Sequence, residues 1–158
     1  MNDIIIYYSR TGTCKKLAEK IQKDLDCPIE SIELKEGYGN YLSSLLRYQR
    51  EKKKAIEPEF STPFLDLESY ERVILVYPIF FGDIPEFVTY YLERCAYKEI
   101  ELIPVSNSTA TSNEKSLATL RERLPKAKIS HPYWQSKFHK GDFPSWIWRV
   151  KAGMPEEE

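Results

Sequence analysis

Short apolar runs alternate with amphipathic stretches along the chain. The apolar runs have the length of buried strands and fall at residues 3–8, 29–34, 72–77, 100–105 and 127–130. Between them, apolar residues recur at helical spacing over residues 13–25, 41–54, 85–94 and 114–124. This alternation predicts βαβ units, and the continuous apolar strands indicate a parallel sheet with helices on both faces. The expected fold class is therefore α/β, a three-layer, doubly wound parallel sheet of five strands.

The size and composition fit one globular domain. The chain has 158 residues, of which 42% are apolar and 30% charged. We expect a single domain over residues 1–153, followed by a frayed acidic end at residues 154–158. The formal net charge of −1 gives no bulk attraction to nucleic acid or to an anionic membrane. The longest apolar run, residues 73–81, contains a proline and is far shorter than the roughly 20 residues of a membrane span.

The amino-terminal residues and the cysteines predict a compartment. Residues 1–3 include no basic residue, and the apolar run behind them is too short for the core of a signal peptide. The cysteines at 14, 27 and 95 form no CxxC pair, and neither they nor the two histidines show metal-ligand spacing. We therefore expect a reduced, cytoplasmic protein without a metal site.

Three loops follow the carboxyl ends of predicted strands, at residues 9–14, 78–84 and 106–113. In a doubly wound sheet such loops meet at one edge, where ligands bind. The first loop combines three hydroxyl side chains with Gly12, and a helix starts directly after it. Unpaired amide groups and the positive end of a helix dipole suit a phosphate. Alternatively, Thr11 or Thr13 only caps the helix.

The second and third loops each allow two interpretations. The second loop contains Phe80 and Phe81, followed by Gly-Asp and enclosed by prolines. The two rings either pack beneath the loop as core or form one wall for a planar ligand. The third loop, residues 106–113, is dense in small hydrogen-bonding side chains. It either binds the polar edge of a ring or supplies Ser112 or Asn113 as a helix cap.

The first two loops together resemble those of the short-chain flavodoxin-like flavoproteins. The family's first loop reads Ser/Thr-x-Thr-Gly-Asn-Thr, where this chain has Ser-Arg-Thr-Gly-Thr-Cys at residues 9–14. Its second loop reads Tyr-Pro-Ile-Trp-Trp-Gly-x-x-Pro, where this chain has Tyr-Pro-Ile-Phe-Phe-Gly-Asp-Ile-Pro at residues 77–85. The resemblance covers about residues 3–130 and extends to a last helix at 145–151. It implies the flavodoxin-like strand order 2-1-3-4-5, with FMN bound non-covalently at the switch point.

The resemblance also implies how FMN is held. The first loop would bind the phosphate through hydroxyls and backbone amides, and the two phenylalanines would lie against the isoalloxazine ring. The Gly-Asp peptide of the second loop would face flavin N5, because a glycine allows that peptide to flip with the redox state. The third loop would meet the pyrimidine edge. The residues implied to bind FMN are Ser9, Arg10, Thr11, Gly12, Thr13, Cys14, Pro78, Ile79, Phe80, Phe81, Gly82, Asp83, Ser106, Asn107 and Ser108.

Three departures from the family pattern bear on function. Thr13 and Cys14 stand where the family has Asn and Thr, and a thiol is a weaker donor than a hydroxyl. Cys14, at a helix start, is either a reactive thiol with a lowered pKa or inert. Phe80 and Phe81 replace two tryptophans, and the third loop lacks the family's Gly-Gly-Ser-Gly run. These departures keep open a flavin-free member of the fold that works as a binding or interaction module.

The function implied by the resemblance is that of an FMN protein. It would transfer electrons to or from a redox partner protein, or act as a small oxidoreductase that passes electrons from NAD(P)H to a quinone-like acceptor. The flavin itself performs this chemistry. We therefore assign no catalytic side chain.

Two further regions carry charge. Arg47, Arg50 and residues 52–54 form a basic stretch that only Glu51 opposes. It is either a solvated helix face or a docking site for an acidic redox partner or a nucleotide phosphate. The segment 131–150 interleaves aromatic with basic residues. We expect it to pack over the sheet edge or in a homodimer contact rather than to bind nucleic acid.

Overall fold

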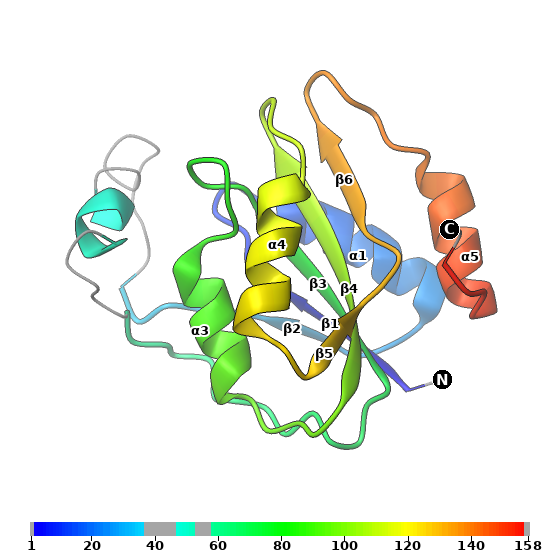
Figure 1. The fold of residues 1–158 in the computed structure, drawn as a ribbon, viewed down its shortest axis with the longest axis horizontal. Coiled ribbons are helices and arrows are strands. Elements are labelled where there is room, and N and C mark those ends of the chain that lie inside the picture. The colour runs from blue at the N-terminus through cyan, green and yellow to red at the C-terminus, as the bar shows by residue number, and fades with distance from the viewer. Residues whose placement is uncertain (1, 37–46, 53–57, 157–158) are drawn as a thin grey trace.

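A parallel sheet forms the centre of the protein, as a computed structural model shows (Figure 1). The structure describes residues 2–36, 47–52 and 58–156. The strands are β1 (Asp3–Tyr7), β2 (Ile29–Ser31), β3 (Arg72–Pro78), β4 (Ile100–Ser108), β5 (Ala127–Ile129) and β6 (Tyr133–Ser136). The helices are α1 (Thr13–Leu25), α3 (Glu86–Arg94), α4 (Glu114–Arg123) and α5 (Phe143–Ala152). Residues 47–52 are also helical, and the rest of the helix predicted over 41–54 lies outside the described residues.

The strands are arranged in the order β2-β1-β3-β4-β5, and all pairings along this path are parallel. This confirms the predicted α/β class and strand order. A further strand, β6, was not predicted, and it pairs in parallel with the second half of β4. The chain leaves β1 for β2 on one side and then returns to place β3 on the other side of β1. Such a reversal leaves a crevice at the carboxyl ends of β1 and β3.

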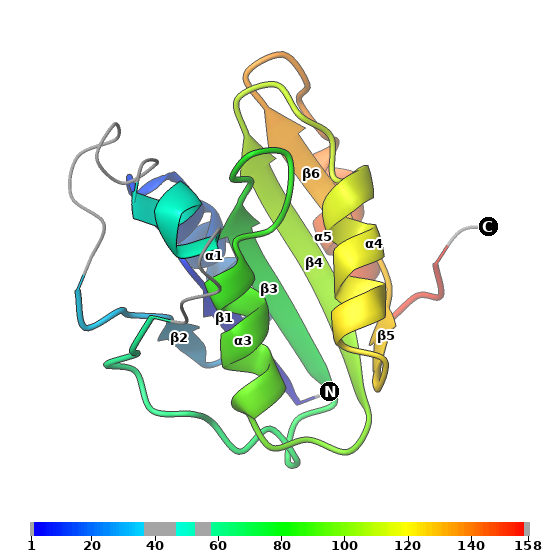
Figure 2. The same cartoon turned by 60° about the vertical axis from the view of Figure 1, so that its left-hand side comes forward.

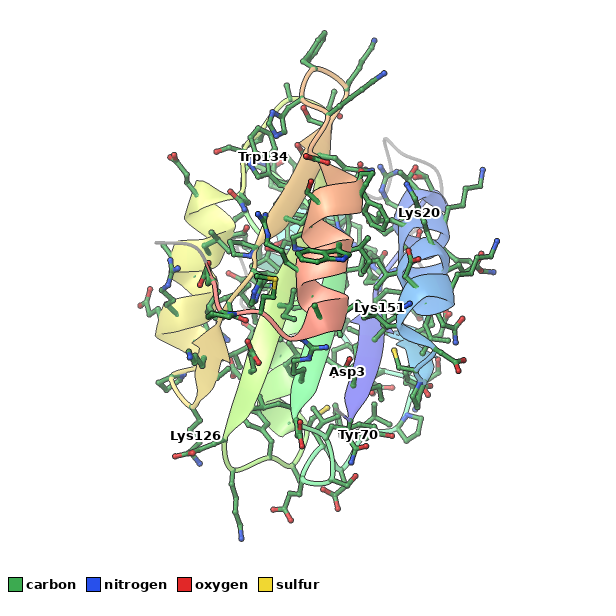
Figure 3. The ribbon with its side chains drawn as sticks, turned by 90° about the vertical axis from the view of Figure 1, so that its right-hand side faces the viewer. Asp3, Lys20, Tyr70, Lys126, Trp134 and Lys151 are labelled. Carbon is green, nitrogen blue, oxygen red and sulfur yellow. The ribbon has the colours of Figure 1, made fainter. Side chains whose placement is uncertain are left out.

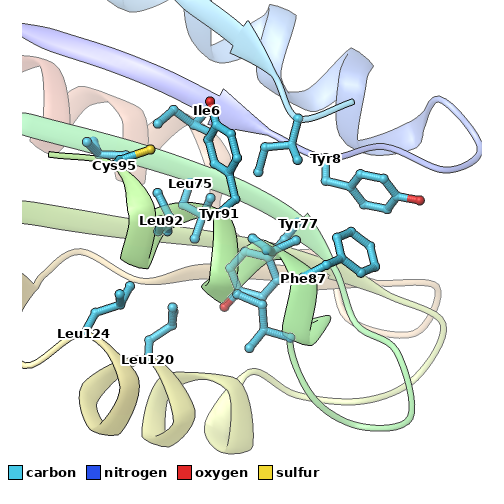
Figure 4. Packing of buried hydrophobic residues seen from close by; sticks show 14 of the residues in the cluster. Ile6, Tyr8, Leu75, Tyr77, Phe87, Tyr91, Leu92, Cys95, Leu120 and Leu124 are labelled. Carbon is cyan, nitrogen blue, oxygen red and sulfur yellow. The ribbon is translucent and has the colours of Figure 1, made fainter. Parts of the chain in front are cut away.

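Helices cover both faces of the sheet. The α3 and α4 helices lie on one face and α1 and α5 on the other (Figures 1 and 2), and Figure 3 looks onto α5 with α1 beside it. Alternating residues of β3 face the two sides of the sheet. Val73, Leu75 and Tyr77 pack in the cluster under α3 and α4, where Figure 4 shows Leu75 and Tyr77. Ile74 and Val76 pack under α1 and α5. Within the described part of the chain, no helix has the length and apolarity needed to cross a bilayer.

The α1 helix follows directly from its sequence pattern. Leu17, Ala18 and Ile21 are buried at helical spacing against the sheet. The helix ends where Asp26 takes a left-handed conformation with φ of 48°, and the backbone N–H of Asp26 donates to the Gln22 carbonyl at 2.7 Å. The predicted range, residues 13–25, therefore agrees with the structure at both ends.

The edge of the sheet beyond β4 is divided. β5 pairs with the first half of β4 and β6 with the second half, and His131 lies between them with φ of 47°. The indole N–H of Trp146 in α5 donates to the His131 carbonyl at 2.7 Å, and Nε2 of His131 lies 2.8 Å from the Met154 carbonyl oxygen. Because β3 pairs with β4 as far as Asn107 and β6 pairs with it as far as Ser108, β4 runs on to Ser108 instead of ending at residue 105 as predicted.

The aromatic segment 131–150 is largely part of the core. Tyr133, Phe143 and Trp146 are buried in the cluster under α1 and α5. Phe138 and Trp148, in contrast, are 78% and 62% exposed. The segment thus packs over the sheet, which is one of the two arrangements expected from the sequence.

Candidate functional site

A pocket of about 320 Å³ lies where the first three loops meet, at the carboxyl ends of β1, β3 and β4. The structure brings together most of the residues that the sequence singled out. Four of the predicted residues shape or support the loops without lining the pocket: Gly12, Gly82, Asp83 and Ser106. One lining residue, Thr109, was not predicted. The wall consists of Ser9, Arg10, Thr11, Thr13, Cys14, Pro78, Ile79, Phe80, Phe81, Asn107, Ser108 and Thr109.

A larger and shallower hollow of about 880 Å³ lies at the opposite end of the sheet. It is formed by the amino ends of β4 and β5 and by neighbouring loop residues, including Tyr70 and Lys126 (Figure 3). In parallel α/β sheets, ligands bind outside the carboxyl ends of the strands. The pocket between the three loops is therefore the candidate site, although it is the smaller of the two.

The first loop presents the start of α1 to the pocket. Gly12 occupies the N-cap position with φ of 97°, and no side chain caps α1. The interpretation of Thr11 or Thr13 as a helix cap is therefore wrong. The backbone N–H of Gly12 donates to Oγ of Ser9 at 3.0 Å, which holds the turn. The amide groups of the first helical turn and the helix dipole are thus available to an anion.

Arg10 adds a positive charge to this end of the pocket. Its guanidinium carbon lies 5.7 Å from the centroid of the Phe80 ring. Among the wall residues, all of which the structure describes, Arg10 is the only one that is charged at neutral pH. The family resemblance implied a role for Arg10 only through its backbone amide, and the loop pattern did not predict that its side chain lies in the pocket wall.

The second loop is a two-residue turn between Phe80 and Asp83. The backbone N–H of Phe80 donates to the Asp83 carbonyl at 2.8 Å, and that of Asp83 donates back at 3.1 Å. Phe81 and Gly82 have φ values of 50° and 81°, as a type I′ turn requires. The carboxylate of Asp83 fixes this turn, because it accepts hydrogen bonds from the Ile84 amide at 2.7 Å and from the Thr119 hydroxyl of α4 at 2.8 Å.

The two phenylalanines differ in environment. Phe80 is 4% exposed and packs edge-on against Tyr8, Tyr48 and Phe87. Phe81 is 50% exposed at the rim of the pocket and stacks on Tyr48, with ring centroids 6.0 Å apart and an interplanar angle of 6°. One ring is thus core and the other an accessible wall. Tyr48 was not predicted, because its contact with the loop is long-range in sequence.

The third loop begins later than predicted. Ser106 is 2% exposed within the sheet, and Asn107 and Ser108 belong to β4 while also lining the pocket. The Asn107 carbonyl accepts a hydrogen bond from the Ile79 amide at 3.0 Å, which joins the second and third loops. Asn113 lies at the N-cap of α4, but its side chain makes no capping bond.

Burial decides the chemistry of Cys14. The thiol is 3% exposed, and burial raises its pKa from 9.0 to about 12. Effectively no thiolate exists at neutral pH, so the interpretation as a reactive thiol is wrong. Within the described residues, no group of three or more His, Cys, Asp or Glu side chains could hold a metal ion.

The strand order, together with a pocket at the point where that order reverses, defines the class of this protein. It is a doubly wound α/β protein whose ligand pocket lies at the carboxyl ends of its strands. The chain belongs to the flavodoxin family, whose family model matches residues 2–148.

Several solved structures share the fold of this chain. A flavoprotein from Lactobacillus acidophilus in complex with FMN has a TM-score of 0.72 and 18% identity, and the match covers 84% of this chain and 91% of that one. A Bacteroides eggerthii protein described as a flavoprotein has a TM-score of 0.76 and 19% identity, covering 96% and 98%. An apo NADH:FMN oxidoreductase has a TM-score of 0.59 and 12% identity, covering 99% and 92%. No curated protein matches the chain.

Proposed function

We propose that this flavodoxin binds FMN non-covalently in the three-loop pocket and transfers electrons to and from a redox partner protein. Membership of the flavodoxin family and the FMN complex of the Lactobacillus acidophilus flavoprotein both support FMN as the cofactor. The pocket fits the group, because an uncapped helix start and Arg10 suit its phosphate. The accessible ring of Phe81 suits the flavin, and Asn107, Ser108 and Thr109 suit the polar edge of the ring system.

The wall chemistry carries the proposal of electron transfer. When bound, FMN supplies a ring system that accepts and donates electrons. The wall contains no carboxylate, histidine or lysine, and its one thiol stays protonated because burial raises the pKa of Cys14 to about 12. No wall residue that the structure describes is therefore suited to exchange a proton with a substrate at neutral pH. The residues instead bind and orient the cofactor.

The neighbouring NADH:FMN oxidoreductase motivates a second candidate. In this case the protein takes electrons from NAD(P)H and passes them to a quinone-like acceptor. Phe81, which is half-exposed at the rim, leaves room for a second planar molecule to approach. The two candidates share the cofactor and differ in the electron donor and in the electron acceptor.

The first experiment tests the cofactor. Purified apoprotein is titrated into FMN, and we expect quenched flavin fluorescence at a ratio of one to one. A colourless protein that also fails to quench added FMN would contradict the proposal and support the flavin-free module. Riboflavin, which lacks the phosphate, is the matched ligand control and should bind far more weakly.

The second experiment separates the two functions. The FMN-loaded protein is mixed with NADH or NADPH, with and without a soluble quinone, and absorbance of the nicotinamide is followed. Steady consumption that requires the quinone would favour the oxidoreductase. An electron carrier should show no such turnover, yet should exchange electrons with a flavodoxin reductase.

A further inference from the structure

The unpredicted strand β6 places Gln135 beside the pocket. Asn107 of β4 and Gln135 of β6 are register partners in the parallel pairing, and their side chains are joined by a hydrogen bond. Asn107 also lines the pocket. β6 therefore contributes a residue that reaches the site only through another side chain.

A short hydrogen-bond chain fixes the orientation of both amides. The hydroxyl of Tyr133 donates to Oε1 of Gln135 at 3.3 Å, and Nε2 of Gln135 donates to Oδ1 of Asn107 at 3.2 Å. The side-chain oxygen Oδ1 of Asn107 is turned towards Gln135 by this hydrogen bond. The side-chain group that Asn107 offers to a ligand is therefore the Nδ2 donor.

Tyr133, the first donor in this series of hydrogen bonds, is anchored in the core. Tyr133 is 6% exposed and packs on Phe143 and Trp146, with ring centroids 5.8 Å and 5.0 Å away. Gly141 adjoins the same ring, and a Cβ at that position would lie 2.6 Å from Tyr133 Cε2. The Tyr133 ring is thus held in place by packing on several sides. Its hydroxyl is therefore a fixed donor that orients the Gln135 amide, and through it the Asn107 amide.

We infer that Gln135 is a positioning residue that holds Asn107 as a hydrogen-bond donor to the flavin, and thereby raises the reduction potential of the bound FMN. This inference rests on the proposed function. Uptake of two electrons and one proton leaves one negative charge on the flavin ring system. Hydrogen bonds to a charged acceptor are roughly twice as strong as those between neutral groups. A donor held at Asn107 therefore favours the reduced cofactor over the oxidised one.

The test measures the midpoint potential of the FMN-loaded protein against a reference dye. Gln135→Leu removes the group that orients Asn107 and is expected to lower the affinity for reduced FMN about tenfold relative to oxidised FMN. For a two-electron couple this corresponds to about 30 mV. Gln22→Leu is the matched control, because Gln22 donates to the Cys27 carbonyl from α1 and is not part of the pocket wall. It should leave the potential unchanged.

A second variant reverses the orientation of Asn107. The carboxylate of Gln135→Glu only accepts hydrogen bonds, so Asn107 must turn its Nδ2 donor towards residue 135 and its oxygen towards the ring. The potential should therefore fall further than in Gln135→Leu. The added negative charge also lowers the potential, and the double variant Asn107→Leu/Gln135→Glu measures that part separately. The shift between Gln and Glu at position 135 should be smaller in the Asn107→Leu background.

The outcomes distinguish this inference from the proposed function. Failure of the wild-type protein to bind FMN overturns the proposed function. Binding of FMN with wild-type potentials in both Gln135 variants overturns only the positioning role. An equal Gln135→Glu shift with and without Asn107 also overturns it, because the charge alone would then explain the effect. Tyr133→Phe keeps the packed ring, loses the hydroxyl, and should give a smaller decrease in potential.

Discussion

At the scale of single residues, the first two pocket loops depend on left-handed backbone conformations. Gly12, Phe81 and Gly82 have φ values of 97°, 50° and 81°. A residue with a side chain costs about 1–2 kcal/mol in this region. Phe81 is nevertheless held there, by the hydrogen bonds of its turn and by the stack on Tyr48. The surrounding contacts thus fix the position of the Phe81 ring at the rim of the pocket.

The first prediction concerns Gly12. A Cβ at this position would meet no atom within 4 Å, so the cost of Gly12→Val is backbone strain, about 1–3 kcal/mol in the free energy of unfolding. Because the first helical turn would shift, we expect FMN affinity to fall at least about a hundredfold while the protein stays folded. Fluorescence titration and urea unfolding measure the two effects.

Gly153 provides the matched control for Gly12. It also has a positive φ, of 67°, but lies at the carboxyl end of α5 and outside the pocket wall. Gly153→Val should therefore lower stability by a similar amount and leave FMN affinity unchanged. Stoichiometric FMN retained by Gly12→Val would show that the phosphate is bound elsewhere.

The second prediction separates the two phenylalanines. Phe80→Ala should cost about 3–5 kcal/mol of unfolding free energy, because it empties a buried site. Phe81→Ala should cost about 1 kcal/mol or less, since the ring is half-exposed. It should however shift the reduction potential of bound FMN, which dye equilibration measures. An unchanged potential would rule out contact between Phe81 and the flavin.

At the scale of elements, local sequence patterns predicted helix bounds better than strand bounds. The α1 helix has the predicted bounds because its buried stripe is set by neighbouring turns of the same helix. The strand predicted at 29–34 is shorter, since β2 ends at Ser31. Beyond it, Leu34 forms an antiparallel bridge with Phe60. The apolar pattern continues to Leu34, but pairing with the distant residue Phe60 takes the end of this segment out of the parallel sheet.

Strand β6 could not be predicted from its own sequence. Its four residues follow a proline and carry one tryptophan and two polar residues among aromatic and basic neighbours. The strand exists because β4 offers an open edge beyond residue 105 and because Trp146 holds the preceding kink at His131. Both causes lie outside the segment, so a local pattern does not contain them.

The third prediction concerns an ion pair that joins three elements. Arg72 donates two hydrogen bonds to the Asp3 carboxylate, at 2.8 Å and 2.7 Å, and a third to the Val150 carbonyl of α5 at 2.9 Å. Arg72 and Asp3 are 3% and 7% exposed, and Figure 3 shows Asp3 near the base of α5. Arg72→Met leaves a buried carboxylate without its partner, so we expect a loss of about 3–5 kcal/mol in urea unfolding.

Two comparisons test the cause of this loss. The double variant Asp3→Leu/Arg72→Met removes both charges and should be more stable than Arg72→Met alone. The exposed pair Arg123–Glu93, with both side chains 30% exposed, is the control. Arg123→Met should cost less than about 1 kcal/mol. Equal losses at Arg72 and Arg123 would contradict a role for burial.

At the scale of the molecule, parallel topology made the site predictable. The ends of β1, β3 and β4 must lie at one edge, so the loops after them were expected to meet before any contact was known. Tyr48, Thr109 and Gln135 were missed for different reasons. Thr109 lies in the predicted third loop, but the residues implied to bind FMN ended at Ser108. Tyr48 and Gln135 act through contacts between segments that are distant in sequence.

The fourth prediction concerns alkaline pH. Burial raises the pKa of Cys14 from 9.0 and the pKa values of Tyr8 and Tyr48 from 10.0, each to about 12. These groups ionise first in the unfolded chain. The stability they contribute is therefore complete below pH 9 and is lost as the pH rises towards 12. We expect a decrease on the order of 5 kcal/mol between pH 8 and pH 11, about half of it from Cys14, measured by urea unfolding.

The variant Cys14→Ala provides the control for this titration. It removes the group with the lowest unfolded-state pKa of the three, so the decrease between pH 9 and pH 10 should be smaller than in the wild-type protein. Stability that does not change up to pH 11 in the wild-type protein would contradict the buried, neutral state of these groups.

The kink at His131 also shortens one border of the sheet. One border of the sheet is β2, with three residues, and the other is divided into β5 with three and β6 with four. Long, flat borders with unpaired backbone groups recruit strands from other chains, and short or bent ones do not. Among the described strands, neither border offers such a template. We therefore expect chains without cofactor to show little edge-to-edge aggregation.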